Sequence, residues 1–161
     1  MDISKEPCPD VWKEGQLCYQ SGLTLETAEK MLSAAEKEAV KQGVPVSIAI
    51  TDAAGHLVAF HRMDNAALFG IQIAINKAYT AVYGKLPTQI WRDIIHAGVL
   101  TPLFYHDNWI AFPGGFPIVK DNKLFGGIGI SGGTYQDTFI AKEALSAGGF
   151  SVADVDAIIN G

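Results

Sequence analysis

Cysteine is scarce in this chain of 161 residues, which contains only Cys8 and Cys18. Both precede the first predicted helix, and no other cysteine exists to complete a zinc ribbon or a Cys-x-x-Cys redox pair. The sequence leaves open whether the two form a disulfide with each other, although cytosolic thiols are normally reduced. The scarcity excludes a cysteine-based zinc site and a dithiol redox centre.

Runs of basic residues and long apolar runs are also missing. The formal net charge is −5 and the sequence pI is about 5.2, without any Lys/Arg run, which argues against a nucleic-acid partner. No apolar stretch approaches the roughly 20 residues of a membrane span. The first residues lack the basic and apolar regions of a signal peptide. The expectation is therefore a cytoplasmic protein with no membrane and no nucleic-acid partner.

Several common catalytic patterns are absent as well. No His-x-x-x-His pair occurs, and His56 and His61 are expected on opposite faces of one hairpin, so a dedicated zinc site is disfavoured. The Gly-x-Gly patterns lie in predicted strands, which disfavours dinucleotide and P-loop chemistry. Ser131 lacks the Gly-x-Ser-x-Gly elbow of hydrolases. No metal site is therefore predicted.

Hydrophobic residues are plentiful, at 48%, against 18% charged residues, which predicts one folded domain with a substantial core. Residues 1–22 are predicted to form an irregular leader, and residues 23–161 a single domain. Helical spacing, alternation and turn residues predict these elements in order: helix 24–42, strands 46–51 and 57–62, helices 66–83 and 87–97, strand 109–112, strands 116–120 and 123–131, helix 134–147, and a short helix 151–159. The order α-β-β-α-α-β-β-β-α with hairpins predicts an α+β fold, an antiparallel sheet covered by helices.

Two glycine clusters flank the polar turn Asp121-Asn122, at 113–117 and 126–133. Glycine lets other atoms approach the backbone closely, and concave runs of backbone N–H groups hold anions. A hairpin would bring the two clusters together beside the sheet. This region is therefore the first place to expect a small-molecule site, with Gly114 and Gly115 as ligand-binding residues.

Ordered motifs along the chain resemble the GlcG/HbpS-like family, a haem-binding or haem-degrading type of domain related to the C-terminal domain of PduO. The matching segments span about residues 23–147 and are Leu23–Ala28, Ile48–Ala59, Arg62–Ala66, Lys77–Ala81, Phe112–Ile118, Gly129–Gly133 and Gln136-Asp137. The resemblance implies a profilin-like α+β fold, a homo-oligomer and haem as a cofactor. Asn65 stands where the family usually has glycine.

Arg62, Asp64 and Lys77 surround one predicted strand-to-helix junction. An Arg and a Lys beside a glycine-rich floor suit a carboxylate or a haem propionate, which makes Arg62 and Lys77 candidate ligand-binding residues. The same residues are equally suited to ion pairs that only fix the junction.

Ser131 and His106 are the remaining polar candidates. Ser131 follows the second glycine run and is placed to donate to a ligand oxygen or to cap a strand or helix. His106, beside Tyr105 and Asp107, has the chemistry of an acid or base near neutral pH, although a solvated loop also accounts for it. Eight aromatic residues are candidates for the walls of an apolar pocket or for ordinary core: Phe60, Phe69, Tyr79, Tyr83, Phe104, Trp109, Phe112 and Phe116.

Two functions of different classes follow from these residues. The first is an oligomeric small-molecule-binding protein whose ligand is haem or a related tetrapyrrole, with an axial histidine or tyrosine that the sequence does not identify. The second is a cofactor-independent isomerase or lyase acting on a small carboxylate or carbonyl metabolite. In it, Arg62 or Lys77 orients the anion, glycine N–H groups stabilise an oxyanion, and His106 or Asp64 moves a proton. A structural subunit without a ligand is a third interpretation.

Overall fold

Four antiparallel strands in the order β2-β1-β4-β3 form the sheet of the computed structural model, which describes residues 22–99 and 106–160. The strands are β1 (Ser47–Asp52), β2 (Leu57–Arg62), β3 (Gly115–Lys120) and β4 (Lys123–Ser131). The two predicted hairpins supply β1 with β2 and β3 with β4, and β1 pairs with β4 to join them. The α+β class and the antiparallel sheet are confirmed.

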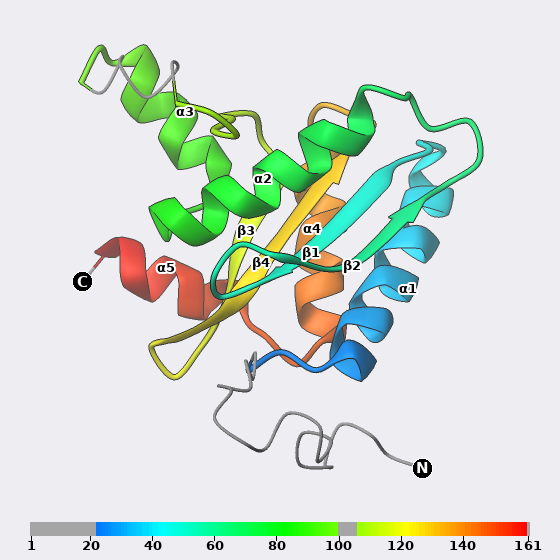
Figure 1. Ribbon diagram of the computed structural model, residues 1–161, viewed down its shortest axis with the longest axis horizontal. Helices are drawn as coiled ribbons and strands as arrows, with labels where there is room; N and C mark the ends of the chain where they lie inside the picture. The colour runs from blue at the N-terminus through cyan, green and yellow to red at the C-terminus, as the bar shows by residue number, and fades with distance from the viewer. Residues whose placement is uncertain (1–21, 100–105, 161) are drawn as a thin grey trace, which may run out of the picture.

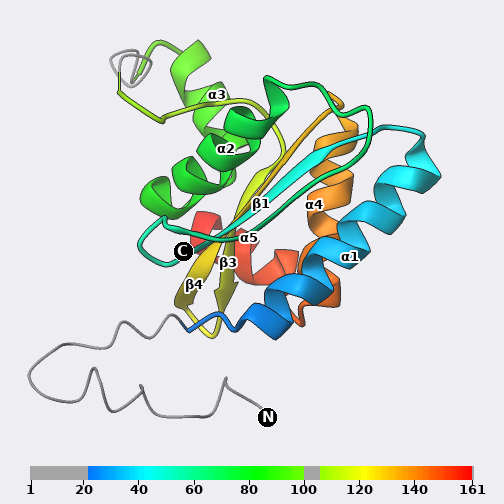
Figure 2. The same cartoon turned by 45° about the vertical axis from the view of Figure 1, so that its right-hand side comes forward.

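Helices cover both faces of this sheet. They are α1 (Leu25–Gln42), α2 (Gly70–Gly84), α3 (Thr88–His96), α4 (Gln136–Ala147) and α5 (Val152–Asn160). Helices α1 and α4 lie side by side on one face, and α2 crosses the other face with α3 beyond it (Figures 1 and 2). No helix among the described residues is long and apolar enough to cross a membrane.

The first helix begins and ends where its sequence predicts. Thr24 caps it, because the Thr24 hydroxyl oxygen accepts a hydrogen bond from the Thr27 N–H at 3.2 Å. Gly43 ends it in the left-handed conformation, with φ 67°, and its N–H donates to the carbonyl groups of Ala39 and Val40. These local contacts need no tertiary partner, which is why the prediction was accurate.

The face of the sheet beneath α1 and α4 is built from large aliphatic side chains. Fully buried isoleucines of three strands make one core with the apolar residues of both helices; the strand residues are Ile48, Ile50, Ile118, Ile128 and Ile130. Alternation along each strand brings them to a single face. This layer holds most of the hydrophobic core.

The opposite face carries small residues, and α2 approaches it closely. Ala49 of β1 packs against Ala74 and Ala78 of α2 in a small core. A Cβ added at Gly129 of β4 would meet the Ala74 carbonyl oxygen at 2.0 Å, and one at Gly127 would meet the Ala78 carbonyl oxygen at 2.5 Å. Gly127 and Gly129 therefore seat the helix. Because β4 pairs with β1 on one side and with β3 on the other, the expected floor of open N–H groups is wrong for this strand.

Most predicted ends fall within two residues of the observed ones, but two predictions differ more clearly from the structure. The segment 109–112 is not a strand, because the Ile110 N–H bonds to the Thr80 hydroxyl and the Phe112 carbonyl accepts from the Thr88 hydroxyl. The helix predicted at 66–83 begins at Gly70, after a turn in which Asn65 has φ 67°. That left-handed conformation explains why glycine suits this position. The predicted leader, Cys8 and Cys18 lie outside the described residues, apart from Gly22.

Candidate functional site

A cavity of about 210 Å³ lies where β4 ends between α2 and α4. Apolar walls surround a small group of polar side chains; the lining residues are Phe69, Ile73, Lys77, Phe112, Pro113, Ser131, Gly133, Thr134 and Asp137. A concave, mainly apolar site with a few convergent polar groups is the usual form of a small-molecule site. We call it the Lys77 cavity.

Lys77 of α2 and Asp137 of α4 form a buried ion pair in this cavity. The Lys77 Nζ lies 2.8 Å from the Asp137 Oδ2, and the two side chains are 3% and 1% exposed. Lys77 also donates to the Ile130 carbonyl oxygen at 2.6 Å, and the Gly133 N–H donates to the Asp137 Oδ1 at 2.8 Å. Two helices and the end of β4 therefore meet at one pair of charges.

Burial narrows the difference in proton affinity between these two groups. Removal from water lowers the pKa of Lys77, against the opposing attraction of Asp137. Removal from water also raises the pKa of Asp137, against the attraction of Lys77 and the N–H groups of Gly133 and Gly132. Burial of the pair therefore shifts the pKa values of the lysine and the carboxyl toward each other. Such pairs, lying in a cavity, are common at functional sites.

Two of the predicted ligand-binding residues, Ser131 and Gly114, lie at this cavity and beside its ion pair. Ser131 ends β4, is 5% exposed and lines the cavity. Gly114 has φ 108°, and a Cβ added there would lie 3.2 Å from the Lys77 Nζ and 2.6 Å from the Asp137 Cβ. Only glycine therefore leaves the ion pair its space. Gly115 lies next to it, but its N–H is already bonded to the Thr88 hydroxyl at 2.9 Å.

The other predicted residues lie outside the Lys77 cavity. Arg62 is exposed at the end of the edge strand β2, where it faces Ser47, which in turn faces Ser131 on the next strand. Asp64 is exposed in the turn before α2. His106 is exposed, bonds to the Asp107 carbonyl at 2.8 Å and packs edge-on near Trp109. The structure therefore brings Lys77, Gly114 and Ser131 together, but neither Arg62 nor a histidine.

Asp137 is the site residue that sequence reasoning missed. It appeared only as part of the Gln136-Asp137 motif, and its distance of 60 residues from Lys77 hid the pairing. Phe69 and Phe112, by contrast, were among the aromatic candidates and do line the cavity. A buried lysine demands a counter-charge, and an acidic residue just after a glycine cluster was the available signal.

The histidines do not form a metal site within the described part of the chain, where no group of three potential metal ligands occurs. His61 of β2 instead faces α1, with its Nδ1 2.8 Å from the Glu36 Oε1 and its Nε2 3.9 Å from the Glu29 Oε2. This contact joins a strand to a helix on the surface.

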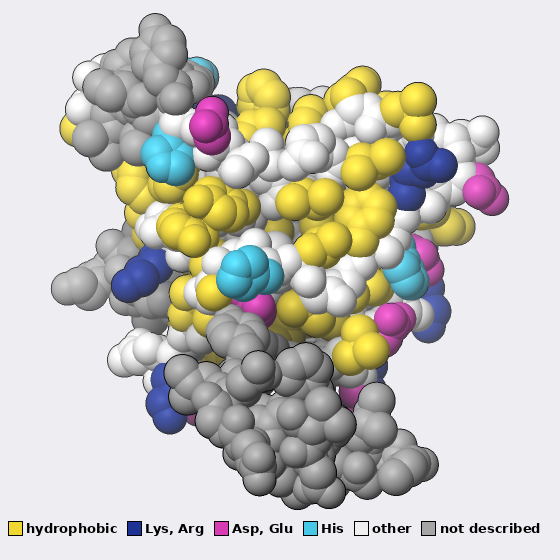
Figure 3. All heavy atoms as spheres, in the orientation of Figure 1, with side chains coloured by type: hydrophobic (Ala, Val, Ile, Leu, Met, Phe, Trp, Pro, Cys, Tyr) yellow, Lys and Arg dark blue, Asp and Glu magenta, His cyan; other side chains and the backbone are white. Residues whose placement is uncertain are grey.

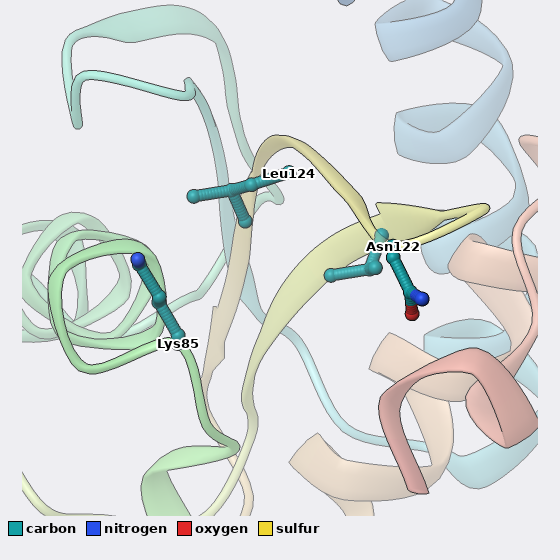
Figure 4. Close-up of a pocket in the computed structure, with 4 residues that line it drawn as sticks. Lys85, Asn122 and Leu124 are labelled. Atoms are coloured by element: carbon teal, nitrogen blue, oxygen red, sulfur yellow. The ribbon is translucent and has the colours of Figure 1, made fainter. Parts of the chain in front are cut away.

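A second cavity of about 430 Å³ lies at the opposite end of β4 from Ser131 (Figure 4). Its described lining comprises Lys85, Val119, Asn122 and Leu124. None of these is a predicted site residue. Lys85 is the single titratable group in that lining, so the converging polar groups of the Lys77 cavity have no counterpart there.

The fold and the cavity define a class, an α+β protein with helices on both faces of one antiparallel sheet and a cavity where one of the two central strands ends. The sequence then specifies the family. Residues 23–146 match the model of the family described as "Haem degrading protein HbpS-like", and the chain belongs to this family.

Relatives and solved structures agree with that assignment. Protein GlcG of Escherichia coli K12 is 35% identical over 113 residues, which are 68% of this chain and 81% of GlcG. The crystal structure of a PduOC:haem complex matches with a TM-score of 0.74 and 33% identity, over 78% of this chain and 94% of that one. A double mutant of HbpS from Streptomyces reticuli matches with a TM-score of 0.73 and 27% identity, over 88% of this chain and 97% of the HbpS chain.

Proposed function

We propose that this protein binds haem or a related tetrapyrrole and does so as a homo-oligomer. The similarity to PduOC, whose structure contains haem, supports this ligand. The supporting observation in this chain is the pair of exposed aromatic rings at the Lys77 cavity: Phe69 is 70% and Phe112 57% exposed. Flat apolar ligands gain from burial against such rings.

The cavity lining suits the rim of a macrocycle rather than its iron. Its described residues include no histidine, cysteine, methionine or tyrosine, which are the usual haem ligands. The Lys77 charge is already paired with Asp137, so a propionate gains little there. We therefore assign no iron ligand and derive no reaction through haem.

Titration with haemin and with iron-free protoporphyrin IX tests this proposal. We expect saturable binding of both, weakened about tenfold in Phe69→Ala/Phe112→Ala by loss of buried apolar area. Val40→Ala is the control, since Val40 is a 67% exposed apolar residue on α1 that does not line the cavity. Binding that never saturates, or that the double variant leaves unchanged, would contradict a tetrapyrrole at this site.

Oligomerisation is proposed from the apolar surface that the described chain leaves uncovered. Half-exposed or more exposed large apolar residues include Leu57, Leu68, Tyr83, Tyr135 and Phe139. Hydrophobic side chains gather over α2 and along the upper edge of the face in Figure 3. Light scattering should give a mass that is a multiple of 17.2 kDa, and a mass of one chain would contradict the proposal.

The cytoplasmic location also stays a prediction, testable by cell fractionation.

The buried ion pair favours a second candidate function, a cofactor-independent isomerase or lyase acting on a small carboxylate or carbonyl compound. Asp137, as a carboxylate, would take the proton from the carbon next to a carbonyl group. The C–H electron pair would become a carbon–carbon double bond, while the carbonyl oxygen takes a proton from Lys77. This assignment replaces His106 and Asp64, which lie outside the cavity, with Asp137.

Proton exchange measures this second function directly. Small ketones and 2-oxo acids incubated in D2O should lose the proton NMR signal next to the carbonyl faster with the protein than without it. Asp137→Asn should slow that exchange at least tenfold while the variant keeps a cooperative unfolding transition. An exchange rate equal to that of buffer alone across the panel would rule out proton abstraction from these compounds.

A further inference from the structure

The size of the Lys77 cavity limits what it can enclose. An engineered protein cavity of about 150 Å³ takes up benzene, so about 210 Å³ accommodates one six-membered ring with a small substituent. A tetrapyrrole is several such rings across and exceeds this volume. A ligand that lies wholly inside the cavity is therefore much smaller than the one proposed for the aromatic rim.

The walls and the polar end of the cavity differ in chemistry. Phe69, Ile73, Phe112 and Pro113 supply apolar surface for a flat ring. Lys77 and Asp137 stand among the polar lining residues, and their charges cancel. A charged group on the ligand would lose its hydration without gaining an unpaired opposite charge in the cavity, and such burial of a charge is costly. The cavity therefore favours an uncharged polar group.

One hydrogen-bond donor of Lys77 remains available for that group. A lysine ammonium has three N–H donors, and two of them reach the Ile130 carbonyl and Asp137. The third has no partner among the described hydrogen bonds of Lys77, and Lys77 lines the cavity. A carbonyl oxygen on the ligand would accept it.

We propose that the Lys77 cavity binds a molecule of about one six-membered ring that carries an uncharged carbonyl group, with the carbonyl oxygen against Lys77 and the ring against Phe69 and Phe112. This inference rests on the second proposed function for its site, because it names the class of compound on which that function would act. It concerns binding alone and therefore holds or fails separately from turnover.

Three probes that share a ring and differ in charge test it: benzamide, benzoate and benzylammonium. Their dissociation constants would be measured by the shifts of backbone amide NMR signals. We expect benzamide to bind most tightly and benzylammonium most weakly, with shifts concentrated at the lining residues. No shifts, shifts spread over the surface, or tightest binding by benzoate or by benzylammonium would each overturn the proposal.

A variant without the Lys77–Asp137 ion pair shows whether the pair is needed for benzamide binding. Lys77→Met/Asp137→Leu removes both charges together, so neither is left buried alone, and the fold can be checked by thermal unfolding. Benzamide should bind this variant at least tenfold more weakly than wild type, whereas Val40→Ala, at an exposed position on α1, should change its affinity less than twofold. Equal affinity of wild type and the double variant would overturn the assigned contact. Benzamide itself has no C–H next to its carbonyl, so the exchange test uses the ketones and 2-oxo acids. Benzamide binding combined with no catalysed exchange across that panel would sustain this inference and refute the second function.

Discussion

The face of the sheet beneath α1 and α4 carries isoleucines, whereas the face beneath α2 carries glycine, alanine, serine and threonine. Large side chains hold a helix away from the strands and fill the space between them. Small ones let the backbone of α2 come close to β4, which brings the Lys77 ammonium within 2.6 Å of a strand carbonyl. The contrast shows that the apolar face holds the core while the small-residue face positions the candidate site.

Among the changes that test this contrast, removing one charge of the Lys77–Asp137 ion pair should lower the free energy of unfolding most. Lys77→Met leaves Asp137 buried without its partner, and we expect a loss of about 3–5 kcal/mol in the free energy of unfolding. The double variant Lys77→Met/Asp137→Leu should regain most of that loss. Urea unfolding measures both.

The exposed pair Lys30–Glu26 is the control for this experiment. Glu26→Gln should cost less than about 1 kcal/mol, because solvent screens surface ion pairs. If Lys77→Met is no more harmful than Glu26→Gln, then water reaches Asp137 and the pair is not buried as the structure shows.

Truncation on the isoleucine face comes next in size. Ile128 is fully buried against α1 and α4, so Ile128→Ala should lose about 2–5 kcal/mol through lost burial and the cavity left behind. Chemical denaturation is the measurement, and Val40→Ala, at a 67% exposed position on α1, is its control. A loss below 1 kcal/mol would mean that this layer is not the main core.

On the small-residue face beneath α2, enlarging a side chain should destabilise the protein, whereas on the isoleucine face the damaging change is shortening one. Gly129→Ala places a methyl group against the α2 backbone and should cost about 1–3 kcal/mol. Gly98→Ala is a useful comparison, because a Cβ there meets nothing within 4 Å and tests only the positive φ of 77°. Gly129 has no positive φ, so a loss below about 1 kcal/mol from Gly129→Ala would contradict the close approach of α2.

The pH dependence of stability should be the smallest effect and the most specific. The pKa of Asp137 is raised in the folded state. Protonation of Asp137 therefore adds to the free energy of unfolding below the ordinary pKa of 3.8, and this contribution is lost as the pH rises through the folded pKa. Because the folded pKa of Lys77 is lowered, stability recovers as pH rises from that value toward 10.5. The free energy of unfolding of wild type minus that of Lys77→Met/Asp137→Leu should therefore fall and then rise as the pH increases. A difference that does not change with pH would argue against both pKa shifts.

Local chemistry explains the parts of the fold that could be predicted from sequence. Thr24 and Gly43 fix the ends of α1, and the Asp121-Asn122 turn joins β3 to β4, because caps and turns depend on neighbours in the chain. The strand expected at 109–112 failed for the opposite reason. Two hydroxyl groups from α2 and α3 bind its backbone, and no local pattern reveals them.

The sequence by itself determined the α+β class, the antiparallel hairpins and the family, while its ligand-binding role for Lys77, Gly114 and Ser131 stays a prediction. These follow from periodicity, turn chemistry and ordered motifs, which are written along the chain. Tertiary structure alone decided that Asp137 neutralises Lys77, that Arg62 stays outside the cavity and that the glycines of β4 seat a helix. Those outcomes depend on which segments pack together, and packing joins residues that are far apart in sequence.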